Sequence, residues 1–438
     1  MRNTILMKYT DHRNFKQMIL DVFNDFNSNT KTILFIEPYG SALSLLKLGI
    51  ASGFNIIILT AHSDLRIVSS AILQSVQLSI QIDTIHDSTM LQLMSMLRDR
   101  IKIDAVIPGF EYFVPIAATI SNYLGLPGIG VDHVMQLRDK GLMRLTLANA
   151  GIAIPQFYIV NSITELANAI ECIGFPAVCK PIDAAGSVNV KKVNSKREAF
   201  MAATRILAGN DVLWGYKLSN KVLYEEYVDG MEYSLEGIVT HGNIIHFSIT
   251  EKFVFDQLEF IEVGHIVNPP IHSVLKNKME KYVEKVMAVL KPNHCPFHAE
   301  IRINKEGEPI LMEIAARLAG DKIGDLINLS KHINYFDYVY AAYMGDLKFR
   351  EHSEVEDVCA GIQFFYRPTI DTYTRVSGLE ESKQYPIEDI SLYYQPNQDI
   401  PVFPKPLRRL GHVMMKNNDY AQLLSTLQLI DKNIVFYP

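Results

Sequence analysis

The first 130 residues alternate short apolar runs with amphipathic runs, and this alternation constrains the fold more than any other feature of the chain. Residues 32–40 (TILFIEPYG) predict a buried strand that runs into a glycine turn, residues 41–53 predict a helix, and residues 54–61 (FNIIILTA) predict a second strand. Strands that alternate with helices in this way specify a parallel sheet covered by helices. We therefore predict an N-terminal parallel α/β domain over residues 1–130.

The first turn of this pattern raises the question of dinucleotide binding. This turn, EPYGSAL at residues 37–43, lacks the three-glycine spacing of a dinucleotide-binding loop. The sequence therefore favours a plain strand-to-helix connection and argues against a dehydrogenase.

The composition argues against several other classes of protein. With 48% hydrophobic and 21% charged residues, the 438-residue chain is not expected to be mainly disordered. Its 42 basic and 48 acidic residues give a net charge of −6, which argues against nucleic acid as a partner. No apolar run approaches the ~20 residues that span a bilayer, and the first residues lack a secretory apolar core. The cysteines form no CxxC pair, as is typical of reduced thiols. We therefore expect a soluble, cytoplasmic protein that binds neither nucleic acid nor membrane.

Two short helices in the middle of the chain are predicted from their first residues. Ser162 with Glu165, and Ser195 with Glu198, each place a hydrogen-bond acceptor at the helix start and a carboxylate three residues later. Between these helices, residues 175–193 (FPAVCKPIDAAGSVNVKKV) predict two strands joined by a loop of small residues. The predicted order is helix, strand, loop, strand, helix.

The rest of the chain is rich in strand patterns. One helix is expected near residues 276–290, and strands dominate on both sides of it. The tail, residues 346–438, alternates short strands with turns that contain proline and glycine, which predicts a small C-terminal α+β domain. A central domain is therefore predicted over residues 131–345.

Two glutamates in the central domain are candidates for a metal site. Glu300 and Glu313 lie on two successive predicted strands joined by the turn KEGE, so the period of two can place them side by side. Adjacent carboxylates repel unless a cation joins them, and oxygen ligands suit Mg²⁺. The alternative is two unrelated solvated acids on exposed strand positions.

Lys180 is a candidate phosphate ligand. It ends the apolar strand FPAVC and precedes a flexible loop that contains Gly186 and Ser187. Glycine-bearing loops expose N–H groups that can bind phosphate oxygens, and a lysine adds a point charge. The alternative is a solvated lysine at a strand end, and Lys140 is by itself more ambiguous still.

The segment VLYEEYVDGMEYS, residues 222–234, is a candidate for binding the edge of a flat heterocycle. An apolar strand here leads to Glu225, Glu226, Tyr227 and Val228. A backbone that leaves the sheet at this point would present a free carbonyl and a free N–H between apolar walls. The alternative is a hairpin with exposed acidic positions.

These features occur in one order over residues 140–317, after a parallel α/β domain. A lysine with a glycine-serine loop comes first, then an acidic strand end, then two strand carboxylates followed by Arg317. This arrangement resembles the ATP-grasp superfamily, and the resemblance covers essentially the whole chain. EIAAR, at residues 313–317, stands in place of the more usual E-x-N-P-R and is most similar to the L-amino-acid ligases, which join two amino acids into a dipeptide.

The resemblance implies that ATP binds between two β-rich subdomains, with a mobile lid over about residues 151–220. It also implies Mg²⁺, for which Mn²⁺ is a possible substitute. The implied ligands are Lys140, Lys180, Gly186 and Ser187 for the phosphates, the backbone of Glu226 and Val228 for the adenine edge, Glu232 for the ribose, Glu300 and Glu313 for the metal, and Arg317 for the γ-phosphate or acyl phosphate.

Two positions depart from the pattern of the superfamily. Ala315 replaces an asparagine, which removes one metal-side ligand and leaves Glu300 and Glu313 to coordinate Mg²⁺ with ATP. Asn189 stands where a glycine is common, so the loop after Lys180 is expected to approach phosphate less freely.

The activity that the resemblance implies is ATP-dependent ligation of a carboxylate to an amine. The carboxylate attacks the γ-phosphorus, with Mg²⁺, Lys180 and Arg317 spreading the charge of the transferring group. An amine then attacks the acyl phosphate and releases phosphate. Closure of the lid protects this intermediate from water.

The substrates are expected to be small molecules, namely amino acids, and two residues are candidates for binding them. His265, in EVGHIVNPP, lies where related enzymes line the acceptor pocket, although a core position is an equal alternative. Asp321, in RLAGD, can pair with an ammonium group or cap the helix that follows.

Alternative functions and assembly states remain open at this point. The chain could be another ATP-grasp enzyme, such as a biotin-carboxylase-like subunit, or an ATP-binding protein without ligase activity. A homodimer is compatible with the sequence.

Overall fold

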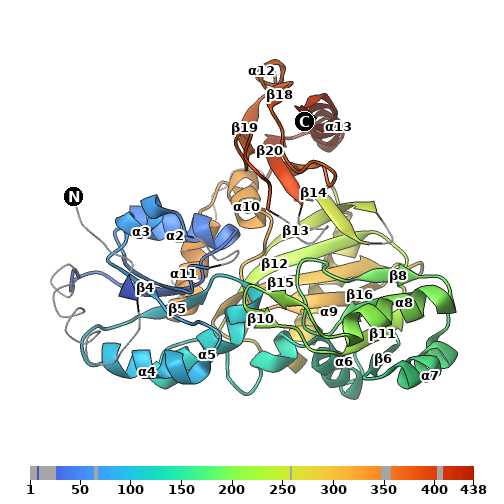
Figure 1. The fold of residues 1–438 in the computed structure, drawn as a ribbon, viewed down its shortest axis with the longest axis horizontal. Helices are drawn as coiled ribbons and strands as arrows, with labels where there is room; N and C mark the ends of the chain where they lie inside the picture. The colour runs from blue at the N-terminus through green and yellow to red at the C-terminus, as the bar shows by residue number, and fades with distance from the viewer. Residues whose placement is uncertain (1–6, 9–25, 64–67, 257–258, 347–356, 402–407) are drawn as a thin grey trace.

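The computed structural model describes residues 7–8, 26–63, 68–256, 259–346, 357–401 and 408–438. The predicted boundary between residues 345 and 346 lies at the end of one described range, and the first residues of the predicted C-terminal domain, 347–356, lie outside the described residues. Figure 1 shows the N-terminal sheet on the left, the lid region on the lower right and the C-terminal strands at the top. Among the described residues, no helix combines the length and the apolar character needed to cross a membrane.

The N-terminal part is a parallel sheet covered by helices, as the alternating pattern predicts. Five strands pair in parallel in the order β1 (Met7–Lys8), β4 (Leu78–Gln81), β3 (Asn55–Thr60), β2 (Thr32–Ile36) and β5 (Ala105–Pro108). The helices of this part are α2 (Ser41–Ala51), α3 (Ser70–Ser75), α4 (Asp87–Leu97), α5 (Val114–Leu124) and the short 3₁₀ helix η2 (Glu111–Phe113). The described residues of β2, β3 and β5 are fully buried, as expected for parallel strands with both faces covered.

The predicted lid, about residues 151–220, contributes three strands to a small antiparallel sheet with two helices packed on it. Its strands are β6 (Phe157–Val160), β11 (Val222–Glu226), β7 (Ala177–Pro181) and β8 (Lys191–Val193), and its helices are α7 (Ile163–Ile173) and α8 (Lys196–Leu207). Both predicted helix starts are confirmed, because Ser162 and Ser195 accept from the backbone N–H groups of Glu165 and Glu198, while the two glutamates accept from the N–H groups of Asn161 and Asn194. The helix α6 (Lys140–Asn149) and the hairpin of β9 (Val212–Leu213) and β10 (Tyr216–Lys217) flank this sheet.

The central element is an eight-stranded antiparallel sheet. Its order is β16 (Pro309–Ala315), β15 (Cys295–Ile303), β12 (Glu232–Thr240), β13 (Asn243–Asp256), β14 (Ile261–Val267), β17 (Cys359–Tyr366), β20 (Arg409–Asn417) and β19 (Ile387–Leu392). The expected helix is α9 (Ser273–Leu290), and α10 (Ile323–Lys331) and α11 (Tyr335–Met344) follow the last central strand. Residues of these helices, of the sheet and of the N-terminal part share one apolar core.

The C-terminal tail contains both strands and helices, and most of its described strands join the central sheet. Its strands β17, β20 and β19 extend the central sheet through the pairing of β14 with β17. Helix α13 (Tyr420–Asn433) packs on β17 and β20, while α12 (Leu379–Ser382) and the pair β18 (Arg375–Ser377) and β21 (Val435–Tyr437) complete the tail. The sequence pattern gives no sign of this shared sheet, and the predicted domain boundaries remain predictions.

Candidate active site

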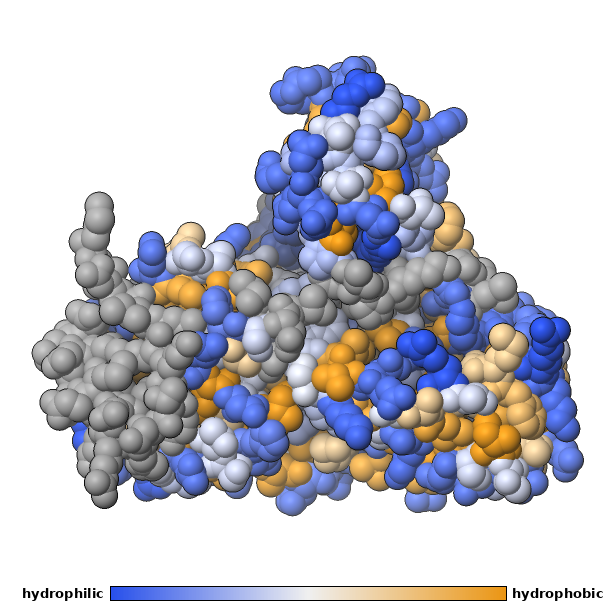
Figure 2. Space-filling view, in the orientation of Figure 1, coloured by the Kyte–Doolittle hydropathy of each residue, from blue (hydrophilic) through white to orange (hydrophobic). Residues whose placement is uncertain are grey.

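A cavity of about 570 Å³ lies where the three parts of the chain meet. Residues from the turn after β2, from the lid sheet, from strands β12 to β16 and from the C-terminal tail all line it. Figure 2 shows one outer face of the molecule, on which apolar residues (orange) form small groups separated by polar residues (blue). Of the residues proposed from the sequence, those lining the cavity are Lys140, Lys180, Gly186, Ser187, Glu226, Val228, Glu232, Glu300, Glu313, Arg317 and Asp321.

The two candidate metal ligands lie opposite each other, as the strand period predicts. Glu300 on β15 pairs in register with Glu313 on β16, and both line the cavity. Each carboxylate also meets a lysine, because Lys140 lies 2.9 Å from Glu313 and Lys252 forms an ion pair with Glu300. The alternative of two unrelated solvated acids is wrong for this geometry, while the metal role remains a prediction.

Glu300 is further held by a buried histidine. The Nε2 atom of His298 lies 3.1 Å from Glu300, and its Nδ1 atom lies 2.9 Å from the buried carboxylate of Glu236. Burial lowers the pKa of His298, but hydrogen bonds to Glu236 and Glu300 more than offset this effect and raise it to about 9. His298 and Lys252 were not identified as site residues from the sequence, although His298 shares a strand face with Glu300.

Lys180 is buried, so the alternative of a solvated strand end is wrong. Its ammonium pairs with Glu225, whose other oxygen accepts from Arg144 Nε at 3.1 Å. Burial lowers the pKa of Lys180, and Glu225 opposes that shift. Burial alone would raise the pKa of Glu225, but Arg144 and Lys180 bring it below its usual value. Lys180 and Lys140 both line the cavity, so two cations are available for phosphate groups.

Gly186 and Ser187, in the loop after Lys180, also line the cavity. The backbone conformation of this loop explains why asparagine is tolerated at position 189. Gly186, Ser187 and Asn189 all have positive φ angles, of 67°, 56° and 59°. Asparagine tolerates this left-handed conformation better than most residues. Its side-chain amide also donates to Asp211 at 2.7 Å. The departure from glycine at position 189 therefore keeps the loop conformation rather than changing it.

The expected adenine and ribose ligands line the same cavity, but Arg302 already forms hydrogen bonds with two of them. Arg302 donates to the carbonyl of Val228 at 3.0 Å, so the contact that we expect from Val228 is its N–H. The same guanidinium donates twice to Glu232, at 2.8 and 2.9 Å. Glu232 would therefore bind a ribose while it holds Arg302, and its role remains a prediction, as does that of Glu226.

Arg317 reaches from the end of β16 to the N-terminal part of the chain. Its guanidinium pairs with Glu111 of η2 and donates to the carbonyl of Leu318 at 2.9 Å. Burial opposes the charge of Arg317, but Glu111 more than compensates and raises its pKa. Glu111 was missed from the sequence because 206 residues separate it from Arg317.

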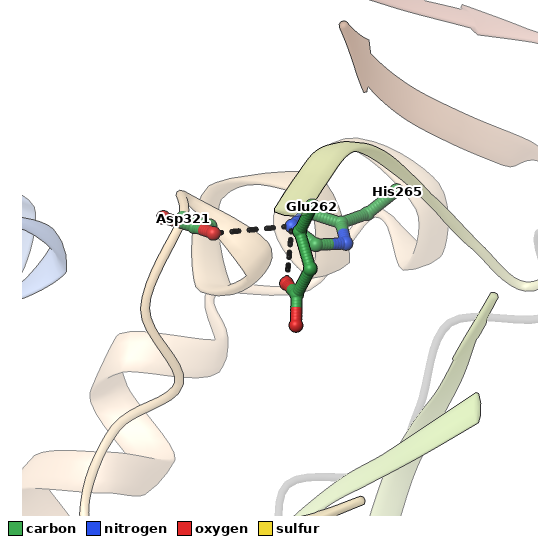
Figure 3. Close-up of side chains that lie close together, drawn as sticks. All are labelled: Glu262, His265 and Asp321. Atoms are coloured by element: carbon green, nitrogen blue, oxygen red, sulfur yellow. Dashed lines mark hydrogen bonds and ion pairs between the residues drawn. The ribbon is translucent and has the colours of Figure 1, made fainter. Parts of the chain in front are cut away.

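His265 and Asp321 meet at the other end of the site, together with Glu262 (Figure 3). His265 Nε2 lies 3.3 Å from Asp321 and 3.6 Å from Glu262. Its side chain is fully buried and reaches the cavity only through these two carboxylates. Asp321 does not cap α10, because Lys322 is the N-cap residue and no side chain caps this helix. The cap alternative for Asp321 is therefore wrong.

The same three residues could hold a metal by distance alone, since one ligand atom of each lies within 4.8 Å of the others. Lys252 lies 2.9 Å from Glu262 and Arg409 lies 2.6 Å from Asp321, but Glu300 and Glu313 are paired with lysines as well, so ion pairing does not separate the two candidate metal sites. Glu300 and Glu313 remain the expected metal ligands because Lys140, an expected phosphate ligand, contacts Glu313. We refer to the part of the cavity that holds Lys140 and Lys180 as the phosphate end, and to the part around Asp321 and Arg409 as the substrate chamber.

An aromatic wall beside this chamber was not identified from the sequence. The rings of Tyr39, Phe110 and Trp214 contact one another, with centroids 4.6 to 6.0 Å apart, and all three line the cavity. Tyr39 and Phe110 come from the N-terminal part, and Trp214 comes from the β9–β10 hairpin. This contact ties the lid region to the N-terminal sheet.

Comparison with known proteins identifies the domain. The ATP-grasp domain family matches residues 173–325. The alanine–anticapsin ligase of Bacillus subtilis strain 168 is 30% identical over 236 residues, which cover 50% of this chain and 49% of that protein. An L-arginine-specific L-amino acid ligase of Bacillus subtilis is 22% identical, with 58% of this chain and 62% of that protein covered. This chain thus spans about half the length of the alanine–anticapsin ligase that it matches.

Solved structures show the same fold over almost the whole chain. The L-amino acid ligase from Bacillus licheniformis superposes with a TM-score of 0.80 at 19% identity, covering 94% of this chain and 100% of that one. A biotin carboxylase from Campylobacter jejuni superposes with a TM-score of 0.67 at 13% identity, with 93% and 92% covered. The α/β and α+β fold expected from the resemblance is therefore confirmed.

Proposed function

Residues 173–325 match the ATP-grasp domain family, and from this premise we propose that the chain is an ATP-dependent carboxylate–amine ligase that joins two amino acids. The observation that carries the proposal is the pairing of Glu300 with Glu313 in a cavity that also holds Lys140, Lys180 and Arg317. Relatives named as amino-acid ligases support the same activity. The substrate chamber around Asp321 adjoins this phosphate end, as a ligase of small molecules requires.

The reaction has two balanced steps. A carboxylate oxygen of the first amino acid attacks the γ-phosphorus of ATP, and ADP leaves. The amine of the second amino acid then attacks the acyl carbon, phosphate leaves, and the nitrogen loses a proton. Lys140 and Lys180 would bind phosphate oxygens. The planar guanidinium of Arg317 would stabilise the charge that develops on the transferring phosphoryl group.

Glu300 and Glu313 fit a divalent cation because both present only oxygen atoms from opposed strand positions. Bound there, Mg²⁺ would neutralise charge on the transferring phosphoryl group, and Mn²⁺ could replace it. The lid helices and the aromatic wall would exclude water from the cavity while the acyl phosphate exists. This protection matters because water competes with the amine for the intermediate.

The test is a screen of phosphate release with ATP, Mg²⁺ and pairs of the twenty standard amino acids, followed by mass detection of the product. We expect at least one pair to give equal amounts of phosphate and dipeptide. Phosphate release that requires bicarbonate would instead support a carboxylase-like enzyme. The absence of any release that depends on an amino acid would reduce the protein to an ATP-binding protein and refute the proposal.

The proposal extends to location and assembly. We propose a cytoplasmic enzyme that acts as a homodimer. Light scattering on the purified protein tests the dimer, and a mass of one chain at assay concentration would contradict it.

A further inference from the structure

Arg409 is a cavity-lining cation that the proposed reaction does not yet use. It begins β20, and the shared central sheet brings this strand beside β17, where the Arg409 guanidinium lies 3.9 Å from the ring centre of Phe364. Only 11% of its side chain is exposed. Stacking on a ring holds the plane of a guanidinium, so Arg409 is fixed in orientation.

The donors of Arg409 are only partly used. Its Nη1 atom donates to Asp321 at 2.6 Å, and its Nη2 atom donates to the carbonyl of Glu262 at 3.0 Å. Its buried Nε has no hydrogen-bond partner in the parts of the chain that the structure describes. A guanidinium carries five N–H donors in a planar fork. Because Nε has almost no exposed surface, a further anion would be bound by the remaining N–H groups of Nη1 and Nη2, and Asp321 need not be released.

The chemistry of ligation requires a cation at this end of the cavity. The reacting carboxylate of the first amino acid must lie at the γ-phosphate, beside Arg317. The second amino acid keeps its own carboxylate ionised while its amine reacts. A buried carboxylate without a counter-charge or hydrogen bonds is costly, so a fixed cation must meet it.

A chain of contacts connects Arg409 to the proposed metal site. Lys252 bridges Glu300, at that site, to Glu262. The backbone of Glu262 in turn accepts from Arg409. One lysine and one glutamate thus separate Arg409 from Glu300, and all four side chains line the same cavity.

We infer that Arg409 binds the α-carboxylate of the amine-donating amino acid and so selects free amino acids over simple amines as acceptors. This inference rests on the proposed ligase function and assigns a specificity role to the C-terminal tail. Asp321 keeps the guanidinium in place, and the tail thereby supplies a contact to the second substrate.

The test compares one acceptor with and without its carboxylate. The first substrate and ATP are held at saturation, and the acceptors are the best amino acid from the twenty-member screen and its primary amide. The variant is Arg409→Gln, and the matched control is Arg408→Gln. The neighbouring Arg408 donates to Asp371 and to the carbonyl of Ile370 and does not line the cavity.

For Arg409→Gln we expect the KM of the amino acid to rise about 10- to 100-fold, which is typical of losing a charge-assisted contact, while the KM of the amide changes less than about twofold. Arg408→Gln should leave both values unchanged. Arg409→Lys keeps the charge but loses the fork, so it should give an intermediate rise for the amino acid alone. This second variant also provides the test if Arg409→Gln does not fold.

Two results would overturn the inference. Equal increases in KM for the amino acid and the amide would show that Arg409 only supports the fold, and unchanged values for both would show that it does not contact the acceptor. Failure of the proposed function looks different, because the wild-type protein would then release no phosphate with any amino acid. That outcome would overturn the inference as well.

Discussion

Glu225 offers a sharp test of how the phosphate end is built. Among the described residues, it is the sole acidic partner of both Lys180 and Arg144, which are buried cations. It pairs with Lys180 through one oxygen and with Arg144 through the other. The exposed fractions are 2% for Glu225, 0% for Arg144 and 6% for Lys180. The change Glu225→Gln keeps the size of the side chain and removes its charge, so both cations lose their counter-charge in a nearly dry environment.

The expected loss of stability follows from this burial. Breaking a buried ion pair by removing one partner costs about 3–5 kcal/mol. Lys180 can limit that cost by releasing its proton, because burial already lowers its pKa and Glu225 opposes the shift. We therefore expect a loss near the lower end, about 3 kcal/mol. A neutral Lys180 also loses its charged contact to phosphate, which should weaken ATP binding about 10- to 100-fold.

The dependence on pH distinguishes this mechanism from simple misfolding. In the variant, the folded-state pKa of Lys180 lies further below its unfolded value, so the unfolded chain binds more protons over the interval between them. The free energy of unfolding of the variant should therefore rise as the pH rises toward the unfolded pKa of lysine, and its deficit relative to the wild type should shrink over that range. ATP affinity should show the opposite trend and improve as the pH falls, because Lys180 regains its proton.

Urea unfolding followed by the fluorescence of the single tryptophan, Trp214, measures the first quantity, and calorimetry with ATP measures the second. The control is Glu226→Gln, which changes an exposed neighbour on the same strand and should cost less than about 0.5 kcal/mol. If Glu225→Gln unfolds at the same urea concentration as the wild type, or if its deficit grows with pH, the assignment of Glu225 as the counter-charge of Lys180 is wrong.

The remaining predictions concern turnover. Glu300→Gln and Glu313→Gln should each lose most phosphate release, because each removes one charge from the proposed metal site, and Glu300→Gln should also cost stability because buried Lys252 and His298 lose a shared counter-charge; near-normal release at limiting Mg²⁺ would contradict the assignment. Lys180→Ala should weaken ATP binding in calorimetry and also lower kcat, since the lysine would touch phosphate before and during the reaction, and an unchanged affinity for ATP would remove it from the site. Arg317→Lys keeps the charge but loses the planar fork, so kcat should fall on the order of 10²–10³ while the Kd for ATP changes little. Weak ATP binding with normal turnover at saturation would make Arg317 an anchor for ATP instead.

Local patterns were sufficient to predict several parts of the site. Glu300 and Glu313 are separated by a short turn, so the strand period alone places them opposite each other. The serine and the glutamate at the start of α7 and of α8 likewise lie three residues apart, and both helices begin where the sequence predicts. In each case the interacting groups are close in sequence, and the geometry of one helix or one hairpin fixes their distance.

Partners distant in sequence were not predictable in the same way. On β11, Tyr224 and Glu225 are both buried although they point to opposite faces, so alternation does not mark Glu225 as a buried acid. Glu111 meets Arg317 only because the N-terminal sheet packs beside the central one. Arg409 reaches the cavity through the pairing of β14, β17 and β20, and no local pattern specifies which strands pair.

Lys252 shows why the two ends of the cavity cannot be treated as independent. Its buried ammonium pairs with Glu300 at the proposed metal site and with Glu262 beside Arg409. Charges joined by adjacent ion pairs in a poorly solvated site interact strongly, and substitutions within one such network are not additive. A change at Arg409 can therefore alter the charge balance around Glu300 as well as the binding of an acceptor. Comparing an amino acid with its amide inside one variant cancels this shared effect, because both acceptors meet the same altered network and differ only in the carboxylate.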